Sequence, residues 1–263
     1  MRICIDPGHG GLDPGCVSDS GLTEKETNLR VALMLERFLT DQGVQVLMTR
    51  REDSDLGLSK RCQMANRWRA DIFVSLHADA GSPEVKGYHV ICSIHSKPDE
   101  GGGKLARLIV DELYVLTGRP PLKRGDNGVW SRESEKNPGT DYYAVIRETN
   151  MPAVIIERGF LTNPEEEQLL YDENYLQLQA KGIARAILRY FGLEMREVNY
   201  MFADTQFHWA RDDIEYAGQI GIVRGDEKGN FNPDHSATRA EVVVLIVRAT
   251  RYILGEVRKM LNR

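Results

Sequence analysis

Short apolar runs rich in Val and Ile alternate with longer helix-like segments through most of this chain, and that alternation most limits what it can fold into. We expect strands at residues 2–6, 44–49, 72–77, 87–93 and 153–157. Between and after them, helical periodicity predicts helices at about residues 25–42, 59–69, 103–117 and 173–191. This order is typical of an α/β domain with a mostly parallel sheet flanked by helices.

A second pattern begins after Gly192, where the last of these helices ends. Residues 193–201 show no clear period and are expected to form a linker. Residues 202–250 hold two helical stretches, at about 208–220 and 238–250, joined by a turn-rich segment. We therefore expect one domain over residues 1–192 and a small all-α module over residues 202–263.

Charge and composition exclude several classes of function. Lys and Arg number 34 against 39 Asp and Glu, a net charge of -5 that disfavours a nucleic-acid partner. The longest purely apolar run, Val242 to Val247, is far shorter than the roughly 20 residues of a membrane-spanning helix, so no membrane insertion is expected. Four cysteines without a CxxC pair predict free, mostly buried thiols: Cys4, Cys16, Cys62 and Cys92.

The first residues lead directly into a strand. Met1 and Arg2 precede Ile3-Cys4-Ile5 with no apolar segment or cleavage site before them, which predicts a chain made without a secretory signal.

Two histidines follow the ends of expected strands. His9 lies in the glycine-rich turn Asp6-Pro7-Gly8-His9-Gly10-Gly11, and His77 lies in Ser75-Leu76-His77-Ala78-Asp79. Parallel strands end at the same edge of a sheet, where α/β proteins bind their ligands, so both imidazoles are candidate zinc ligands. For either histidine alone, a structural role is the alternative.

Two glutamates complete the candidate site. Glu24 opens the first helix after a loop, where its carboxylate could return to the same edge as a third ligand, or serve only as a helix-dipole partner. Glu157 ends an apolar strand, so it must be paired or functional, and either Arg147 or a metal-bound water would satisfy it. Three ligands beside a free carboxylate form the arrangement of a zinc hydrolase, in which the metal acidifies a water and the carboxylate accepts its proton.

These motifs occur together, and in order, in one known family. Residues 6–11, the Glu24-Lys25 pair with Asn28-Leu29, residues 75–79 and residues 152–163 resemble the zinc-dependent N-acetylmuramoyl-L-alanine amidases of bacterial cell walls. The resemblance covers residues 2–191 and implies that His9, Glu24 and His77 bind zinc. It implies that Glu157 is the catalytic carboxylate, acting as general base and then returning the proton to the leaving amine. Arg158 and residues 119–142 depart from the family pattern.

The C-terminal segment resembles a second family. Its matching blocks are Phe202-Ala203-Asp204, His208-Trp209-Ala210, residues 221–225, residues 229–233 and residues 238–241. They look like one S-layer homology repeat, which implies binding to secondary cell-wall polysaccharide through Trp209, Arg239 and Glu241. Trp209 and Phe231 are expected to fill a small core. The alternative role for Arg239 is an ion pair within the module, for example with Glu241.

Together these patterns predict a peptidoglycan hydrolase that cleaves the amide between N-acetylmuramic acid and L-alanine. A zinc peptidase that cuts the stem peptide and a non-catalytic wall-binding protein are the alternatives. The absence of a signal favours a phage endolysin, held in the host cytoplasm until lysis, over a processed autolysin. Proteins that resemble the S-layer homology family usually pack three repeats together, and a single repeat left alone would expose apolar surface. The resemblance therefore implies a homotrimer through residues 202–263.

The remaining features are given local roles. Four histidines join no cluster and are expected at the surface or in packing: His89, His95, His208 and His235. Asp126-Asn127-Gly128 predicts a turn. Glu165-Glu166-Glu167 is expected to form the solvated first turn of a helix after Asn163-Pro164.

Overall fold

The computed structural model describes residues 1–261. The chain divides into two compact units, Met1–Arg196 and Glu197–Arg263, which we describe separately.

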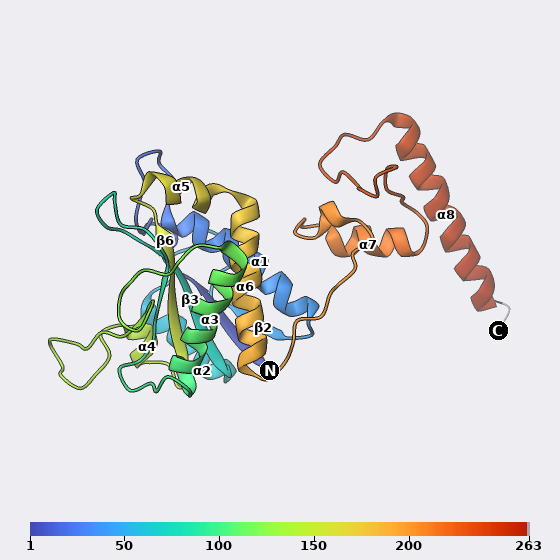
Figure 1. Cartoon of the computed structure of the whole chain (residues 1–263). Coiled ribbons are helices and arrows are strands. Elements are labelled where there is room, and N and C mark those ends of the chain that lie inside the picture. Colours follow the sequence, from blue (N-terminus) through green and yellow to red (C-terminus); the bar gives the residue numbers. More distant parts are fainter. Residues whose placement is uncertain (262–263) are drawn as a thin grey trace. The chain divides into compact units, whose positions relative to one another are not determined.

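A six-stranded sheet forms the centre of the first unit, in the strand order β2-β1-β3-β6-β4-β5 (Figure 1). Neighbouring strands are parallel except β4, which runs antiparallel to β6. The expected α/β class with a mostly parallel sheet is confirmed. The strands are β1 (Arg2–Pro7), β2 (Gln45–Met48), β3 (Ile72–Asp79), β4 (His89–Ile91), β5 (Val129–Trp130) and β6 (Ala153–Phe160).

Helices cover both faces of this sheet. Helices α1 (Glu24–Asp41) and α3 (Gly101–Thr117) pack against the strands, and α6 (Glu173–Tyr190) packs against both of these helices. On the other face, α2 (Leu58–Trp68) and α4 (Ala144–Arg147) bury an apolar cluster with the strands. Two alternate residues of β6, Ala153 and Ile155, belong to that cluster, because successive side chains of a strand point to opposite faces. Cys4 of β1 and Phe73 of β3 join them.

Helix α5 (Pro164–Tyr171) follows β6 and corrects one expectation. Asn163 caps its first turn by accepting hydrogen bonds from the backbone N–H groups of Glu165 and Glu166. The prediction that this turn is solvated is wrong at Glu166, which is 3 % exposed. Its carboxylate accepts hydrogen bonds from the backbone N–H groups of Gly87 and Phe160, both at 2.8 Å, and these donors compensate for its burial.

Three smaller expectations concern the cysteines, the turn at Asn127-Gly128 and membrane-spanning helices. All four cysteines are free, and Cys4, Cys62 and Cys92 are buried. Asp126 and Val129 exchange two backbone hydrogen bonds around Asn127 and Gly128, which confirms the turn. Asn127 and Gly128 both have positive φ, as a tight hairpin turn requires. None of the helices within residues 1–261 is long and apolar enough to cross a membrane.

The second unit contains one turn of 3₁₀ helix (Ala203–Thr205), α7 (Arg211–Gln219) and α8 (Arg239–Leu261). Its small interior holds Phe202 and Ile214, and the Phe231 ring lies 5.4 Å from that of Phe202. The expectation that Trp209 fills this core is wrong, because Trp209 is 84 % exposed. Phe202, which precedes the 3₁₀ turn, occupies the interior instead.

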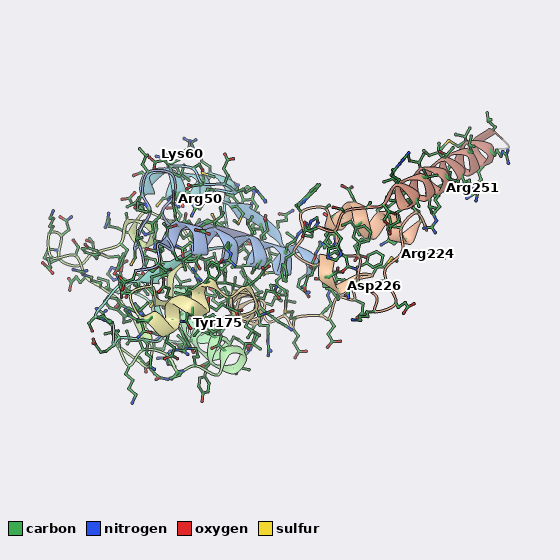
Figure 2. All side chains as sticks on the ribbon, turned by 90° about the horizontal axis from the view of Figure 1, so that it is seen from above. Arg50, Lys60, Tyr175, Arg224, Asp226 and Arg251 are labelled. Atoms are coloured by element: carbon green, nitrogen blue, oxygen red, sulfur yellow. The ribbon has the colours of Figure 1, made fainter. Side chains whose placement is uncertain are left out.

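Helix α8 is longer than the expected 238–250 and has no buried residue. Figure 2 shows side chains projecting from it along its length, with Arg251 among them. Its exposed apolar residues include Val243, Val247, Leu254, Val257 and Leu261. These lie three, four or seven positions apart, so they share one side of the helix.

Candidate metal centre

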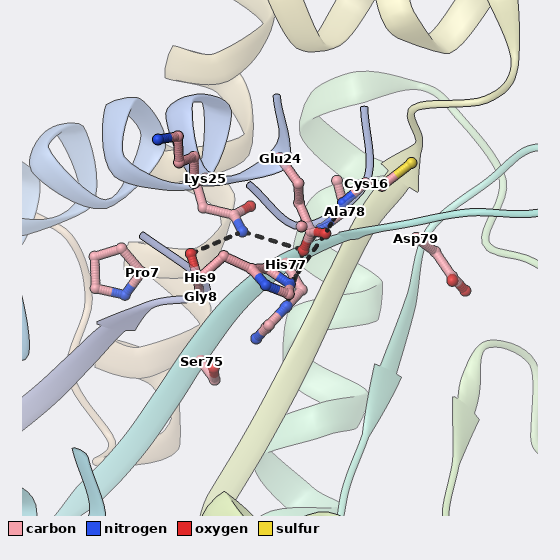
Figure 3. Close-up of polar contacts among 12 residues, drawn as sticks. Pro7, Gly8, His9, Cys16, Glu24, Lys25, Ser75, His77, Ala78 and Asp79 are labelled. Carbon is pink, nitrogen blue, oxygen red and sulfur yellow. Dashed lines mark hydrogen bonds and ion pairs between the residues drawn. The ribbon is translucent and has the colours of Figure 1, made fainter. Parts of the chain in front are cut away.

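The two candidate histidines and Glu24 meet at the carboxyl edge of the sheet. His9 follows the end of β1, His77 lies near the end of β3, and Glu24 is the first residue of α1. One ligand atom from each lies within 4.8 Å of the others (Figure 3). The structure thus brings together three side chains that are distant in the sequence.

The glycine-rich turn after β1 positions His9 and leaves space for His77. A Cβ atom at Gly8 would lie 2.3 Å from Cε1 of the His77 ring, so no other residue type fits without moving that ring. His9 itself has a φ of 60°, a left-handed conformation that is unfavourable for a residue with a Cβ. Two arginines hold this turn: Arg61 donates to the carbonyl of His9 at 2.8 Å, and Arg50 donates to that of Gly8 at 2.9 Å.

The carboxylate of Glu24 is buried and held by fixed donors. Its Oε2 accepts a hydrogen bond from the backbone N–H of Cys16 at 3.0 Å. Its Oε1 accepts one from the backbone N–H of Ala78 at 3.1 Å and another from Nδ2 of Asn28 at 3.2 Å. A Cβ atom at Gly15 would lie 2.5 Å from Oε2, so a side chain there would displace the carboxylate.

Glu24 lies between the two imidazoles. His9 Nε2 is 3.1 Å from Glu24 Oε2, and His77 Nδ1 is 2.9 Å from Glu24 Oε1. Burial alone would raise the pKa of Glu24, but hydrogen bonds from His77 and His9 hold it well below its usual range. The carboxylate is therefore ionised, as a metal ligand must be.

The pKa values of His9 and His77 are raised, whereas that of Glu24 is lowered. Burial alone would lower the pKa of His9, but its hydrogen bonds to Glu24 and to Asp13, whose Oδ2 lies 2.7 Å from Nδ1, raise it to about 9. Burial likewise opposes a raised pKa at His77, and the hydrogen bond with Glu24 outweighs it. Two imidazoles converging on one carboxylate make a site that attracts either protons or a cation.

Glu157 lies beside this group. It pairs in register with His77 on the adjacent strand β6, and its Oε2 is buried with no hydrogen-bond partner among the described residues. Burial raises the pKa of Glu157 to about 7, although His77 opposes the shift. Arg147, the suggested partner, instead donates to the carbonyls of Asp141 and Tyr142.

His89, on the neighbouring strand β4, packs among aromatic rings. His89 on β4 pairs with Glu157 across the antiparallel ladder and is 1 % exposed. Its ring lies 5.8 Å from that of Trp130 and 6.3 Å from that of Phe160, so it is a packing histidine, as expected. The guanidinium of Arg124 lies 3.4 Å from the centre of the Trp130 ring.

From the sequence, no role was assigned to several residues that contact the site, although Asn28 belongs to one of the matching blocks. Asp13 lies four residues after His9, and Asn28 lies one helical turn after Glu24, so local spacing could have indicated both. Arg50 and Arg61 reach the glycine-rich turn from later segments, and no local signal marks them.

The three predicted wall-binding residues do not line one shared hollow. Glu241 accepts a hydrogen bond from the backbone N–H of Thr238 at 2.7 Å, and its own N–H donates to the Thr238 hydroxyl, which is a capping box at the start of α8. Glu241 also lines a hollow of about 760 Å³ together with Arg224 and Arg248. Trp209 and Arg239 are exposed and are not among the residues that line this hollow.

The donor set at the sheet edge fits a metal ion. Two imidazole nitrogens and a carboxylate oxygen are ligands that divalent zinc accepts, and Glu157 supplies an unpartnered carboxylate beside them. The fold and this site define a metal-binding hydrolase of α/β form.

The family profile of the N-acetylmuramoyl-L-alanine amidases matches residues 3–189, and that of the S-layer homology domain matches residues 202–243. The chain belongs to the N-acetylmuramoyl-L-alanine amidase family, with an S-layer homology domain after the amidase domain.

Named relatives agree with this assignment. The amidase AmiC of Neisseria meningitidis is 32% identical over 216 residues, which cover 72% of this chain and 52% of AmiC. The amidase CwlM of Bacillus licheniformis is 33% identical over 202 residues, 73% of this chain and 70% of CwlM. This chain therefore matches about half the length of AmiC.

Solved structures show the same fold. The catalytic domain of the amidase CwlV from Bacillus (Paenibacillus) polymyxa var. colistinus superposes with a TM-score of 0.62 at 33% identity, covering 73% of this chain and 99% of that one. An N-acetylmuramoyl-L-alanine amidase from Clostridium difficile 630 gives a TM-score of 0.63 at 32% identity, covering 72% and 96%.

Proposed function

We propose that this protein hydrolyses the amide bond between N-acetylmuramic acid and L-alanine in peptidoglycan, using a zinc ion held by His9, Glu24 and His77. The observation that carries the proposal is the convergence of these three ligand atoms within 4.8 Å, beside the unpartnered carboxylate of Glu157. Zinc would polarise the amide carbonyl and acidify a water molecule.

The protein's own residues supply proton transfer and orientation. Glu157, as the general base, accepts a proton from the attacking water through Oε2 and then delivers it to the departing amine nitrogen of L-alanine. Its pKa, raised to about 7 mainly by burial, suits a group that both takes and gives a proton near neutral pH. Asp13 holds Nδ1 of His9, so that Nε2 is the atom presented to the ligand site.

The bond that is cut can be read from the products. Digestion of purified peptidoglycan should release peptides with a new N-terminal L-alanine and leave the glycan strands intact. New N-termini within the stem peptide would instead identify a peptidase. If the wild-type protein produces no new N-termini at all, it is a non-catalytic protein. The same digestion with Glu157→Gln is the control for contaminating hydrolases.

We further propose that the second unit binds secondary wall polysaccharide and so brings the enzyme to the wall. Trp209 is 84 % exposed and offers a ring face for sugar packing, while Arg239 is an exposed cation suited to an acidic sugar. Glu241 acts indirectly, by capping the helix that carries Arg239.

Sedimentation with intact walls tests this anchor. A chain truncated after Arg196 keeps the hydrogen bonds between Gln42 and Arg196, so it should still cleave a soluble muramyl peptide while remaining in the supernatant. Trp209→Ala and Arg239→Ala should weaken sedimentation of the full chain, whereas Lys228→Ala should not. Equal sedimentation of the full and truncated chains would remove the anchor proposal.

A further inference from the structure

Arg158 is a buried cation directly after Glu157 on β6. It is 1 % exposed, and no carboxylate of the described residues lies within ion-pair distance of it. Burial lowers the pKa of Arg158 to about 10, which still leaves it charged at neutral pH. A buried charge with only neutral hydrogen-bond partners is destabilising, so its position calls for an explanation beyond packing.

Strand alternation sends Arg158 to the face of the sheet opposite Glu157, towards α1 and α6. There Nη2 donates to Oδ1 of Asn28 at 2.7 Å, and Nη1 donates to Oε1 of Gln179 at 3.1 Å. Gln179 returns a hydrogen bond from Nε2 to the Arg158 carbonyl at 2.8 Å. The guanidinium is thereby fixed between the two helices.

The contact with Asn28 determines which way the Asn28 carboxamide faces. A guanidinium can only donate hydrogen bonds, so the oxygen of Asn28 must point at Arg158 and its NH₂ group must point away. That NH₂ group donates to Oε1 of Glu24 at 3.2 Å. Asn28 is fully buried, so water cannot replace either partner.

We propose that Arg158 is a positioning residue for the metal centre: it locks the Asn28 carboxamide, and Asn28 in turn holds the Glu24 carboxylate where it binds the metal. This inference rests on the proposed metal centre. Arg158 touches neither the metal ligands' donor atoms nor the substrate site. Its effect is transmitted by one amide group, and the helical spacing of Glu24 and Asn28 places that amide one turn from the ligand.

Zinc affinity of the full-length chain, measured on metal-free protein by competition with a chromogenic chelator, is the direct test. Arg158→Met and Asn28→Ala should each raise the zinc Kd about 10- to 100-fold, the usual effect of removing a group that orients a ligand. Arg158 and Asn28 act through the same amide group. The zinc Kd of the double variant, Arg158→Met with Asn28→Ala, should therefore be no more than about twofold higher than that of Asn28→Ala alone.

Arg119→Met is the matched control. Like Arg158, Arg119 joins segments that are distant in the sequence, in its case through ion pairs with Glu165 at 2.8 Å and Glu166 at 3.2 Å. Among the described residues it makes no hydrogen bond or ion pair with Asn28 or Glu24. Thermal unfolding of the metal-free proteins should show lower melting temperatures for Arg119→Met and Arg158→Met alike, while only the latter loses zinc affinity. A merely structural role for Arg158 would leave the zinc Kd unchanged.

A zinc Kd for Arg158→Met within threefold of wild type, or an equal loss in Arg119→Met, would overturn the inference. If Arg158→Met does not fold, Arg158→Lys replaces it under the same criteria, because one ammonium cannot contact Asn28 and Gln179 in the same fork geometry. Wild-type protein that binds no zinc would overturn the proposed metal centre itself, whereas normal wild-type binding with unaltered variants would overturn only the role of Arg158.

Discussion

His77 and Glu157 lie directly opposite each other on the adjacent parallel strands β3 and β6. Paired residues of neighbouring strands present their side chains on the same face, so the strand register itself sets the proposed ligand beside the proposed base. The placement of these two side chains relative to each other thus depends on the backbone hydrogen bonds between β3 and β6.

Replacing Glu157 by Gln should leave the fold and the zinc content unchanged and lower the rate of amide cleavage by about 10²- to 10⁴-fold, because the general base is lost. Rates on purified peptidoglycan, with zinc measured on the same samples, check this. Glu135→Gln, at a highly exposed glutamate, is the control and should be fully active. Normal activity in Glu157→Gln would assign the base to another residue.

Metal analysis should find one zinc per chain, with the His9 and His77 nitrogens at about 2.0–2.1 Å from it in a structure of the loaded protein. A chelator should abolish wall digestion, and added zinc should restore it. His9→Ala and His77→Ala should each lose the metal, whereas His89→Gln should keep it. Full digestion by the metal-free protein would contradict the proposed mechanism.

The glycine at position 8 is required by the shape of the site. Gly8→Ala would bring a Cβ atom within 2.3 Å of the His77 ring, so we expect the ring to move, zinc to be lost and the protein to be destabilised by about 1–3 kcal/mol. Gly57→Ala is the matched control, since no neighbouring atom lies within 4 Å of its added methyl group. Unaltered zinc binding in Gly8→Ala would show that the site tolerates displacement of His77.

His89 should make the stability of the first unit dependent on pH. Burial, assisted by Arg124, lowers the pKa of His89 to about 4, whereas in the unfolded chain it is about 6.5. Between about pH 4 and pH 6.5, His89 therefore takes up a proton when the chain unfolds. The free energy of unfolding falls as the pH decreases from about 6.5 towards 4. At pH 5 this contribution amounts to about 2 kcal/mol relative to pH 8.

Urea unfolding at pH 8 and pH 5 measures that loss. His89→Phe should show a smaller difference between the two pH values than wild type, and His95→Gln, at an exposed histidine, should match wild type. An identical pH dependence in His89→Phe and wild type would mean that other groups cause it.

Light scattering should detect self-association through α8. This helix has no buried residue and exposes Val247, Leu254 and Leu261 on one side, so association of three chains through it would remove apolar surface from water. We expect a mass of about three chains that falls to the monomer after truncation at Arg196. A mass near 29.8 kDa at all concentrations would exclude the trimer.

The sequence predicted most of the sheet and the approach of the four candidate residues, because apolar alternation and strand ends are local signals. It did not predict that β4 runs antiparallel to β6, since strand direction depends on how the connecting segments cross the sheet. The two-residue strand β5 is also too short to produce a periodic pattern.

Burial of polar and aromatic residues was the least predictable feature. Glu166 is buried because the backbone N–H groups of Phe160, six residues earlier, and of the distant Gly87 both donate to it, and Trp209 is exposed because Phe202 occupies the small interior. Neither six- nor seven-residue spacing produces a periodic pattern that would mark these contacts, and Gly87 lies 79 residues from Glu166. The same holds for Arg158, whose partners Asn28 and Gln179 come from separate helices.

The strand order places β1, β3 and β6 next to one another inside the sheet, with β2 on one side and β4 and β5 on the other. Each of these inner strands leads to or carries a proposed ligand or the base, so fraying at the edges would leave His9, His77 and Glu157 in place. Amide protons of these three strands should consequently exchange with solvent only through global opening of the first unit. Heat inactivation would then be all-or-none, with no partly unfolded population that retains zinc but lacks hydrolysis.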